Sequence, residues 1–176
     1  MKKHFAGILA CLFLTVTLSA GSLLQTPDWQ QYSYAEDGFS VSMPSKPVFA
    51  KQNKETAAGT VEIHNYSVQL SDNAGVMVSS VNFPPMDVPA KDLLQGGKNG
   101  ALQSVKATLI SEKEITLDGS PGLEFEAASD AYHVRARMYM VKTRLLTLLV
   151  IAPAGAPFPA EAGRILDSVK LIAPTP

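Results

Sequence analysis

Residues 145–151 near the C-terminal end of the chain, LLTLLVI, are apolar at all but one position. Side chains of a β-strand alternate between the two faces of its sheet, so a strand that is apolar at both parities has to be covered on both sides. The run is far shorter than the roughly 20 apolar residues that cross a bilayer. It therefore predicts a central strand in a sheet that carries a further layer on each face.

The rest of the chain supplies more strands, hairpin turns and two helices. Residues 39–43 alternate apolar and polar side chains directly after Asp37-Gly38, which predicts a hairpin with the aromatic stretch before it. Further strands are predicted over residues 60–70, 75–83, 107–117, 123–127 and 132–141, and helices over residues 91–105 and 159–169. Hairpins in place of alternating strand–helix units favour an α+β fold, with an antiparallel sheet flanked by helices on both faces.

The first predicted helix contains the stretch Gly96-Gly97-Lys98-Asn99-Gly100. Each glycine in a helix interior costs about 1 kcal/mol relative to alanine, which weakens this helix. The stretch lacks the preceding strand and the Ser or Thr after the lysine that a phosphate-binding loop requires. We interpret it as a bendable segment of the helix and not as a nucleotide site.

Residues 1–20 have the layout of a secretory signal peptide, with two lysines ahead of an apolar run over residues 5–18 and small residues after it. We expect cleavage near Ala20 and a single exported domain over residues 21–176, in the periplasm or outside a bacterial cell. A retained leader that anchors the domain is the alternative. After cleavage, no stretch is long enough for a stable membrane span.

Composition excludes several chemistries for this domain. Cys11 is the only cysteine and lies in the predicted leader, so the mature domain would have no disulfide, thiol nucleophile or cysteine–zinc site. The leader also holds two lysines, which leaves 13 of the 15 basic residues against 16 acidic ones, a formal net charge of −3. A weakly acidic domain without a basic stripe is not expected to bind nucleic acid.

The candidate site lies on two consecutive predicted strands. Glu124 and Glu126 share one face of the first strand, and His133, Arg135 and Arg137 share one face of the second. Depending on the turn, the glutamates lie opposite His133 and Arg135, or opposite Arg135 and Arg137. Both registers give a structural ladder of acid–base pairs, each worth about 0.2–1 kcal/mol. The functional alternative is a polar face that contacts a ligand or a partner protein.

Other residues raise catalytic and metal-binding alternatives. Ser120 follows a glycine, but it enters a strand and no G-x-S-x-G elbow surrounds it, so a hydrolase is a remote alternative. A pocket that brings His133 within hydrogen-bond reach of Ser120 would revive it. A zinc site from Glu62, His64 and His133 would require their strands to be neighbours. We expect no metal, no cofactor and two unrelated histidines.

Three stretches resemble a known family in their order and spacing: the aromatic strand and turn over residues 29–47, the GSPGLE turn over residues 119–124 and the closing helix over residues 158–171. The chain resembles exported PsbP-like domains, whose superfamily includes the PsbP extrinsic subunit of photosystem II and a nuclear Ran-binding protein. The resemblance implies an α/β/α sandwich around an antiparallel sheet and a non-catalytic accessory or binding role. It identifies no functional residue in this sequence.

We therefore predict an exported accessory or binding protein that is not an enzyme, with another envelope or periplasmic protein as its partner. The alternative is a carrier of a small ligand or a metal that uses the strand face of His133, Arg135 and Arg137. The state of the two arginines bears on the carrier hypothesis. A carrier needs them free to bind an anion, whereas a structural ladder pairs them with the glutamates.

Overall fold

The computed structural model describes residues 29–56 and 59–172 of the 176-residue chain. The predicted leader over residues 1–20 lies outside the described residues. Within the described ranges the chain forms ten strands and two α-helices, arranged around two antiparallel sheets. No helix in these ranges is long and apolar enough to cross a membrane.

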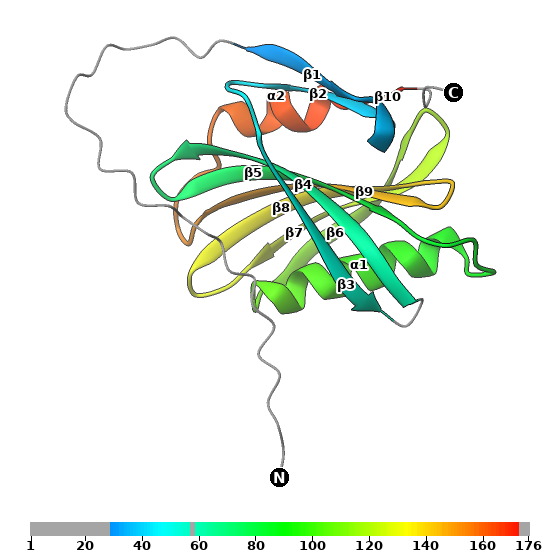
Figure 1. Ribbon diagram of the computed structural model, residues 1–176. Helices are drawn as coiled ribbons and strands as arrows, with labels where there is room; N and C mark the ends of the chain where they lie inside the picture. Colours follow the sequence, from blue (N-terminus) through cyan, green and yellow to red (C-terminus); the bar gives the residue numbers. More distant parts are fainter. Residues whose placement is uncertain (1–28, 57–58, 173–176) are drawn as a thin grey trace.

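The larger sheet of the described chain has seven antiparallel strands in the order β3-β4-β5-β9-β8-β7-β6 (Figure 1). Its strands are β3 (Val48–Thr56), β4 (Gly59–Ser71), β5 (Ala74–Asn82), β6 (Thr108–Leu117), β7 (Ser120–Ala128), β8 (Tyr132–Val141) and β9 (Arg144–Pro153). All of them except β3 correspond to predicted strands. The prediction of an α+β fold with a mainly antiparallel sheet is confirmed.

β9 is the central strand that the apolar run predicts. It pairs with β5 on one side and with β8 on the other. Leu146, Leu148 and Val150 are at most 1 % exposed and belong to one core, whereas Leu145 and Ile151 pack into a second core. Full burial of such a side chain contributes about 1.5–3 kcal/mol, so this strand stabilises both cores.

The first core lies between the large sheet and a composite layer. This layer combines a small three-stranded sheet, in the order β1-β2-β10, with the helix α2 (Glu161–Asp167) (Figure 1). The predicted hairpin is present, as β1 (Gln30–Tyr34), the 3-10 turn η1 (Ala35–Asp37) and β2 (Phe39–Met43), and β10 (Lys170–Leu171) pairs with β2. Phe39 and Val41 of β2 and Ile165 of α2 are completely buried in this core.

The second core lies under the helix α1 (Ala90–Ser104), which crosses the opposite face of the large sheet (Figure 1). Leu94 of the helix packs with Leu123, Phe125 and Met138 of the sheet. The sequence predicted helices on both faces, whereas the structure has α1 on one face and the small sheet together with α2 on the other. The difference arises because the amphipathic hairpin at the start of the domain also has an apolar face to bury.

β3 is the strand that the sequence pattern does not predict. Eight of its nine residues are exposed, and it pairs with β4 only, at the edge of the sheet. A strand with so little apolar surface to bury shows no hydrophobic periodicity. Its lysines, Lys51 and Lys54, are typical of an edge that is protected against pairing with other chains.

Gly97 explains how α1 accommodates glycine in its interior. A Cβ at Gly97 would lie 2.8 Å from Cε of Met138 and 2.9 Å from Cδ2 of Leu145, so the ends of both side chains would have to move to make room for it. At Gly96 and Gly100 a Cβ would have no neighbour within 4 Å. The three glycines of one segment therefore have different roles.

We expect Gly97→Ala to destabilise the protein by about 1–3 kcal/mol, because the added methyl group overpacks the second core. Gly96→Ala and Gly100→Ala are the matched controls, and each is expected to stabilise the protein by about 0.4–1 kcal/mol through better helix propensity. Urea denaturation of the three variants measures these differences. Similar effects of all three substitutions would contradict the close approach of α1 to the sheet.

Candidate functional site

The hairpin of β7 and β8 positions the predicted site residues. Asp118 (φ 49°) and Gly119 (φ 78°) adopt the left-handed backbone that a tight two-residue turn from β6 into β7 requires. Gly122 then lies opposite Tyr139, and a Cβ at Gly122 would be 2.6 Å from an atom of the Tyr139 ring. The tyrosine ring thus occupies the space over the glycine, a fit that stabilises this register of the two strands.

In this register Arg137 lies opposite Glu124 and Arg135 lies opposite Glu126. It is the second of the two registers that the sequence allows, and His133 lies beyond both glutamates. The predicted ladder of acid–base pairs is confirmed. The ladder projects from the same face of the large sheet as the first core, since the next residue along this face of β8, Tyr139, is part of that core.

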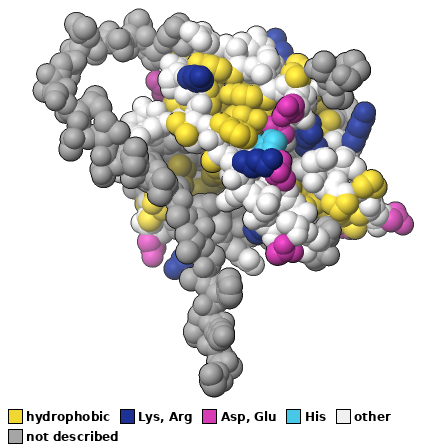
Figure 2. Space-filling view, viewed as in Figure 1, with side chains coloured by type: hydrophobic (Ala, Val, Ile, Leu, Met, Phe, Trp, Pro, Cys, Tyr) yellow, Lys and Arg dark blue, Asp and Glu magenta, His cyan; other side chains and the backbone are white. Residues whose placement is uncertain are grey.

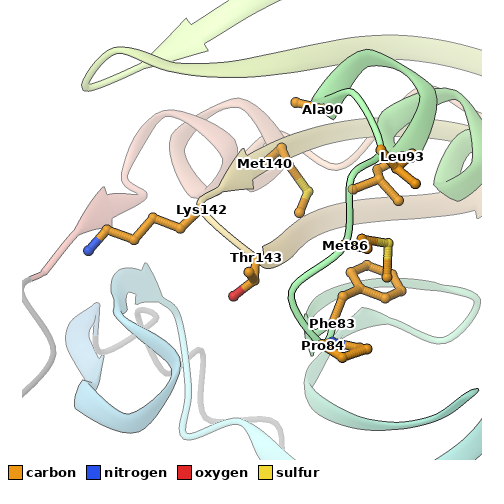
Figure 3. Close-up of a pocket in the computed structure, with 9 residues that line it drawn as sticks. Phe83, Pro84, Met86, Ala90, Leu93, Met140, Lys142 and Thr143 are labelled. Atoms are coloured by element: carbon orange, nitrogen blue, oxygen red, sulfur yellow. The ribbon is translucent and has the colours of Figure 1, made fainter. Parts of the chain in front are cut away.

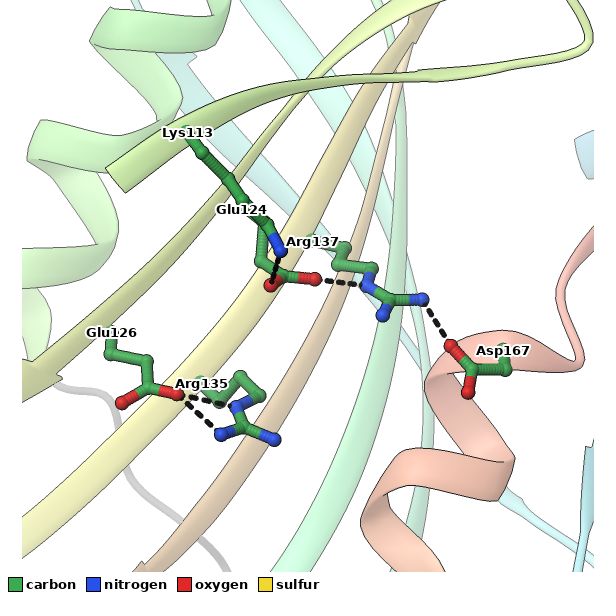
Figure 4. Close-up of polar contacts among 6 residues, drawn as sticks. All are labelled: Lys113, Glu124, Glu126, Arg135, Arg137 and Asp167. Atoms are coloured by element: carbon green, nitrogen blue, oxygen red, sulfur yellow. Dashed lines mark hydrogen bonds and ion pairs between the residues drawn. The ribbon is translucent and has the colours of Figure 1, made fainter. Parts of the chain in front are cut away.

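We call Glu124 and Arg137 the inner pair of the ladder, and Glu126 and Arg135 the outer pair. The inner pair belongs to a network of four residues (Figure 4). Arg137 donates from Nε to Glu124 and from Nη1 to Oδ1 of Asp167, at 2.7 Å, at the end of α2. Lys113 on β6 places its Nζ 2.8 Å from the other oxygen of Glu124. The side chains of Glu124 and Arg137 are 16 % and 24 % exposed, so the network is partly shielded from water.

The inner pair is held in its charged form. Burial alone would raise the pKa of Glu124, but the hydrogen bonds from Lys113 and Arg137 outweigh it and hold the pKa below 4.5. Burial also opposes the charge on Arg137, yet its bonds to Glu124 and Asp167 raise the pKa above its ordinary value. Such groups are poor proton donors and acceptors near neutral pH, where a general acid or base has to change its charge.

The outer pair is more exposed and lies against an aromatic ring. Arg135 donates from Nε (2.7 Å) and Nη2 (2.5 Å) to one oxygen of Glu126, and Nε2 of His133 is 3.8 Å from the other. The Phe158 ring centroid is 4.9 Å from the Arg135 guanidinium carbon and 4.2 Å from the His133 ring centroid. The sequence did not reveal Phe158 and Asp167 as neighbours of the site, because only the tertiary fold brings them to the hairpin.

The polar face as a whole is electrically balanced. Its three cations and three anions pair with one another: Lys113, Arg135, Arg137, Glu124, Glu126 and Asp167. Arginines that already bind carboxylates offer no ready site for an anion. None of these described side chains is a nucleophile next to a base, which covalent catalysis requires.

Ser120 and His133 lie at opposite ends of the β7–β8 hairpin. Ser120 begins β7 and lies opposite Leu117, whereas His133 lies opposite Ala128 at the other end of the strand. A rise of about 3.3 Å per residue separates these ends by about 26 Å. The structure therefore contradicts a hydrolase that uses Ser120 with His133.

The three residues considered for zinc are separated as well. Glu62 and His64 are on β4, and two strands, β5 and β9, lie between β4 and the strand that carries His133. His64 instead lies between Glu62 (2.7 Å) and Asp37 (2.9 Å). The sequence pattern does not show the contact with Asp37, because the pair Asp37-Gly38 predicts only a turn. Over residues 29–56 and 59–172, no group of three or more His, Cys, Asp or Glu side chains is arranged to hold a metal ion.

A small cavity of about 70 Å³ lies where the segment before α1 meets the end of the β8–β9 hairpin (Figure 3). Its wall is mainly apolar and includes Phe83 and Met140. Two polar side chains of the wall are directed elsewhere, since Lys142 points away from the cavity (Figure 3) and the Thr143 hydroxyl donates to Asn82. Ligand sites usually have about 300–1,000 Å³ and convergent polar groups, so this cavity does not define one.

Comparison with solved structures identifies the fold. The solution structure of cyanobacterial PsbP (CyanoP) from Synechocystis sp. PCC 6803 matches with a TM-score of 0.58, over 88 % of this chain and 98 % of that chain, at 15 % sequence identity. No protein-family model matches the chain, and no curated protein matches it. The chain therefore has a PsbP-like fold, as the resemblance of its sequence implied.

A double-mutant cycle on Glu124 and Arg137 is expected to give a coupling energy of about 1 kcal/mol at neutral pH, because the pair is partly buried. The more exposed pair of Glu126 and Arg135 is the comparison, with an expected coupling below about 0.5 kcal/mol. Glu124 has a pKa lowered by folding, so its contribution is present above pH 4.5 and is lost as the pH falls through the lowered value. Urea denaturation measures both cycles, and an outer coupling as large as the inner one would contradict this ranking.

Proposed function

We propose that this protein is an exported, non-catalytic accessory or binding protein that contacts another protein of the cell envelope. The PsbP-like fold carries the proposal, since the resemblance of the sequence to PsbP-like domains implies an accessory or binding role. The charged side chains of the candidate site add support. They hold one another in their charged forms, which suits recognition of a partner better than proton transfer.

The contact surface that we propose is the polar face of the β7–β8 hairpin, formed by Glu124, Glu126, His133, Arg135 and Arg137. Its outer end combines an arginine that is 36 % exposed with the ring of Phe158, and arginine and aromatic residues are enriched in protein interfaces. Asp167 extends the face to the end of α2 with a carboxylate that is 69 % exposed. A partner with complementary charges could bind there without breaking the ladder.

No observation favours the alternative of a small-ligand or metal carrier on this face. An anion would have to displace Glu126 from Arg135, or Asp167 from Arg137, and both contacts are 2.7 Å or shorter. The arginine would then exchange one carboxylate for another anion with little net gain. A thermal-shift screen with phosphate, sulfate and zinc tests the alternative. Stabilisation by an anion that Arg135→Ala abolishes, or by zinc that His133→Ala abolishes, would favour a carrier.

A charge swap on the outer pair tests the proposed contact surface. In the variant with both Glu126→Arg and Arg135→Glu the ladder can pair again, so its stability is expected to stay within about 0.5 kcal/mol of the wild type. The charge pattern that a partner meets is reversed, and we expect capture of the partner from the native envelope to fall at least tenfold. Affinity capture after chemical cross-linking of the full chain, quantified by mass spectrometry, measures the loss.

The swap of Lys91→Glu with Glu114→Lys is the matched control. It reverses an exposed ion pair of 3.1 Å between α1 and β6, on the opposite side of the large sheet. This control is expected to capture the partner as the wild type does. Equal capture by both swap variants would show that the polar face is not the contact surface, and failure to recover any reproducible partner would count against the binding function itself.

A further inference from the structure

His64 lies between the two layers that enclose the first core. On β4 it shares a face with Glu62 and Tyr66, and this face looks toward the small sheet. Its Nδ1 is 2.9 Å from Oδ2 of Asp37 on η1, and its Nε2 is 2.7 Å from Oε1 of Glu62. The Tyr66 hydroxyl donates to the same Asp37 oxygen at 2.5 Å. Asp37 is only 5 % exposed, so these contacts replace most of the water that its carboxylate would otherwise bind.

The two contacts of His64 determine its protonation state. An ionised carboxylate can only accept hydrogen bonds, and a neutral imidazole has a proton on just one ring nitrogen. Because both ring nitrogens face carboxylate oxygens, only the protonated ring satisfies Asp37 and Glu62 together. Loss of the proton leaves a nitrogen lone pair against an oxygen of Asp37 or of Glu62, which is repulsive. In either tautomer it also removes the positive charge that faces the buried carboxylate of Asp37.

The other charged and titratable groups near His64 come from several elements. Lys51 on β3 lies opposite His64 and places its Nζ 2.6 Å from Glu62. The guanidinium group of Arg144 on β9 lies beside Gly38, the residue after Asp37: a Cβ added at Gly38 would be 3.1 Å from Nη1 of Arg144. Nearby titratable groups on the same side of the large sheet are Glu36 on η1, Tyr34 on β1 and Tyr66 on β4. Figure 2 shows, on the side of the molecule that Figure 1 views, a histidine (cyan) with acidic and basic side chains around it and an apolar area beside it.

We propose that His64 is a pH-sensitive latch, which in its protonated form ties η1 and the β1–β2 hairpin to β4 and loosens the hairpin when the proton is lost. The latch goes beyond the proposed binding function, because it rests on the geometry of Asp37, His64 and Glu62 alone. Its consequence reaches the core, since β2 contributes the fully buried Phe39 and Val41. Loosening of the hairpin would therefore uncover apolar surface of the large sheet.

The pKa shifts give the direction of the switch. Burial would lower the pKa of His64, but the hydrogen bonds to Asp37 and Glu62 outweigh it and raise the pKa above 6.5. The raised pKa means that His64 stabilises the folded form fully below pH 6.5, and that this stabilisation is lost as the pH rises through the raised value. Burial opposes ionisation of Asp37 too, yet Tyr66 and His64 lower its pKa below 3.8, so Asp37 stays ionised throughout this window.

Backbone hydrogen exchange followed by NMR tests the latch on the full chain. The protection factors of the amides in β2 are compared with those of α1 from about pH 6 to about pH 9, across the range where a histidine titrates. We expect protection in β2 to fall relative to α1 as the pH rises. The fall should be roughly tenfold for each unit by which the pKa of His64 exceeds that of the unfolded chain.

Two substitutions separate the latch from a general effect of pH. His64→Gln keeps a hydrogen-bonding side chain that cannot titrate, and it is expected to abolish the pH dependence in β2. His133→Gln, at the other histidine of the described chain, is the matched control and is expected to preserve it. A wild-type profile that is flat, a pH dependence that persists in His64→Gln, or one that disappears in His133→Gln would each overturn the latch.

The ring proton signal of His64 in the wild type gives a readout that does not depend on the folding of a variant. Its titration midpoint is expected above 6.5, because the ring has to donate to two carboxylates. A midpoint at or below 6.5 would overturn the latch as well, since the protonated ring would then gain nothing from folding.

Discussion

The burial of β9 on both faces is the constraint on which the rest of the structure depends. Leu146, Leu148 and Val150 require one cover, and Leu145 and Ile151 require another. The chain supplies the two covers from different segments: α1 on one face, and the small sheet with α2 on the other. The close fit of α1 at Gly97 is a local consequence of the same demand, because the helix has to approach the sheet closely to bury its apolar face.

Paired charges attach both covering layers, α1 and the composite layer, to the large sheet. Paired charges also form the polar face of the β7–β8 hairpin, next to the edge of the first core. The composite layer is tied through Asp37 with His64 and through Asp167 with Arg137, and α1 through the buried Lys98 with Glu112. Along one face of β8, Tyr139 is buried, Arg137 is 24 % exposed and Arg135 is 36 % exposed. Every second residue of β8, from position 139 to position 135, is therefore more exposed than the one before. The aliphatic parts of the two arginine side chains lie near the core, and their guanidinium groups lie at its edge. We propose that a polar face of this origin serves as a contact surface for a partner.

The sequence was most informative where one residue type decides the local structure. The apolar run of β9 predicted the place of this strand in the sheet, and Asp37-Gly38 predicted a turn, since the left-handed backbone of Gly38 suits few other residues. The pairing of Glu124 and Glu126 remained open between two registers, because parity defines a face but not the partner strand's offset. The sequence does not predict β3, because eight of its nine residues are exposed and show no apolar pattern. Phe158, Asp167 and the contact of Asp37 with His64 depend on tertiary packing, for which a single sequence has no local signal.

The central claim is that the polar face of the β7–β8 hairpin is the contact surface of a binding protein. A photo-reactive amino acid in place of Lys113, which is 66 % exposed beside this face, tests it most directly in the cell that produces the protein. The same amino acid in place of Glu114, which is 78 % exposed on the opposite face of the same strand, is the control. The account predicts a cross-link to a distinct envelope protein from position 113 and none from position 114. No adduct from position 113, or the same adduct from both positions, would contradict it.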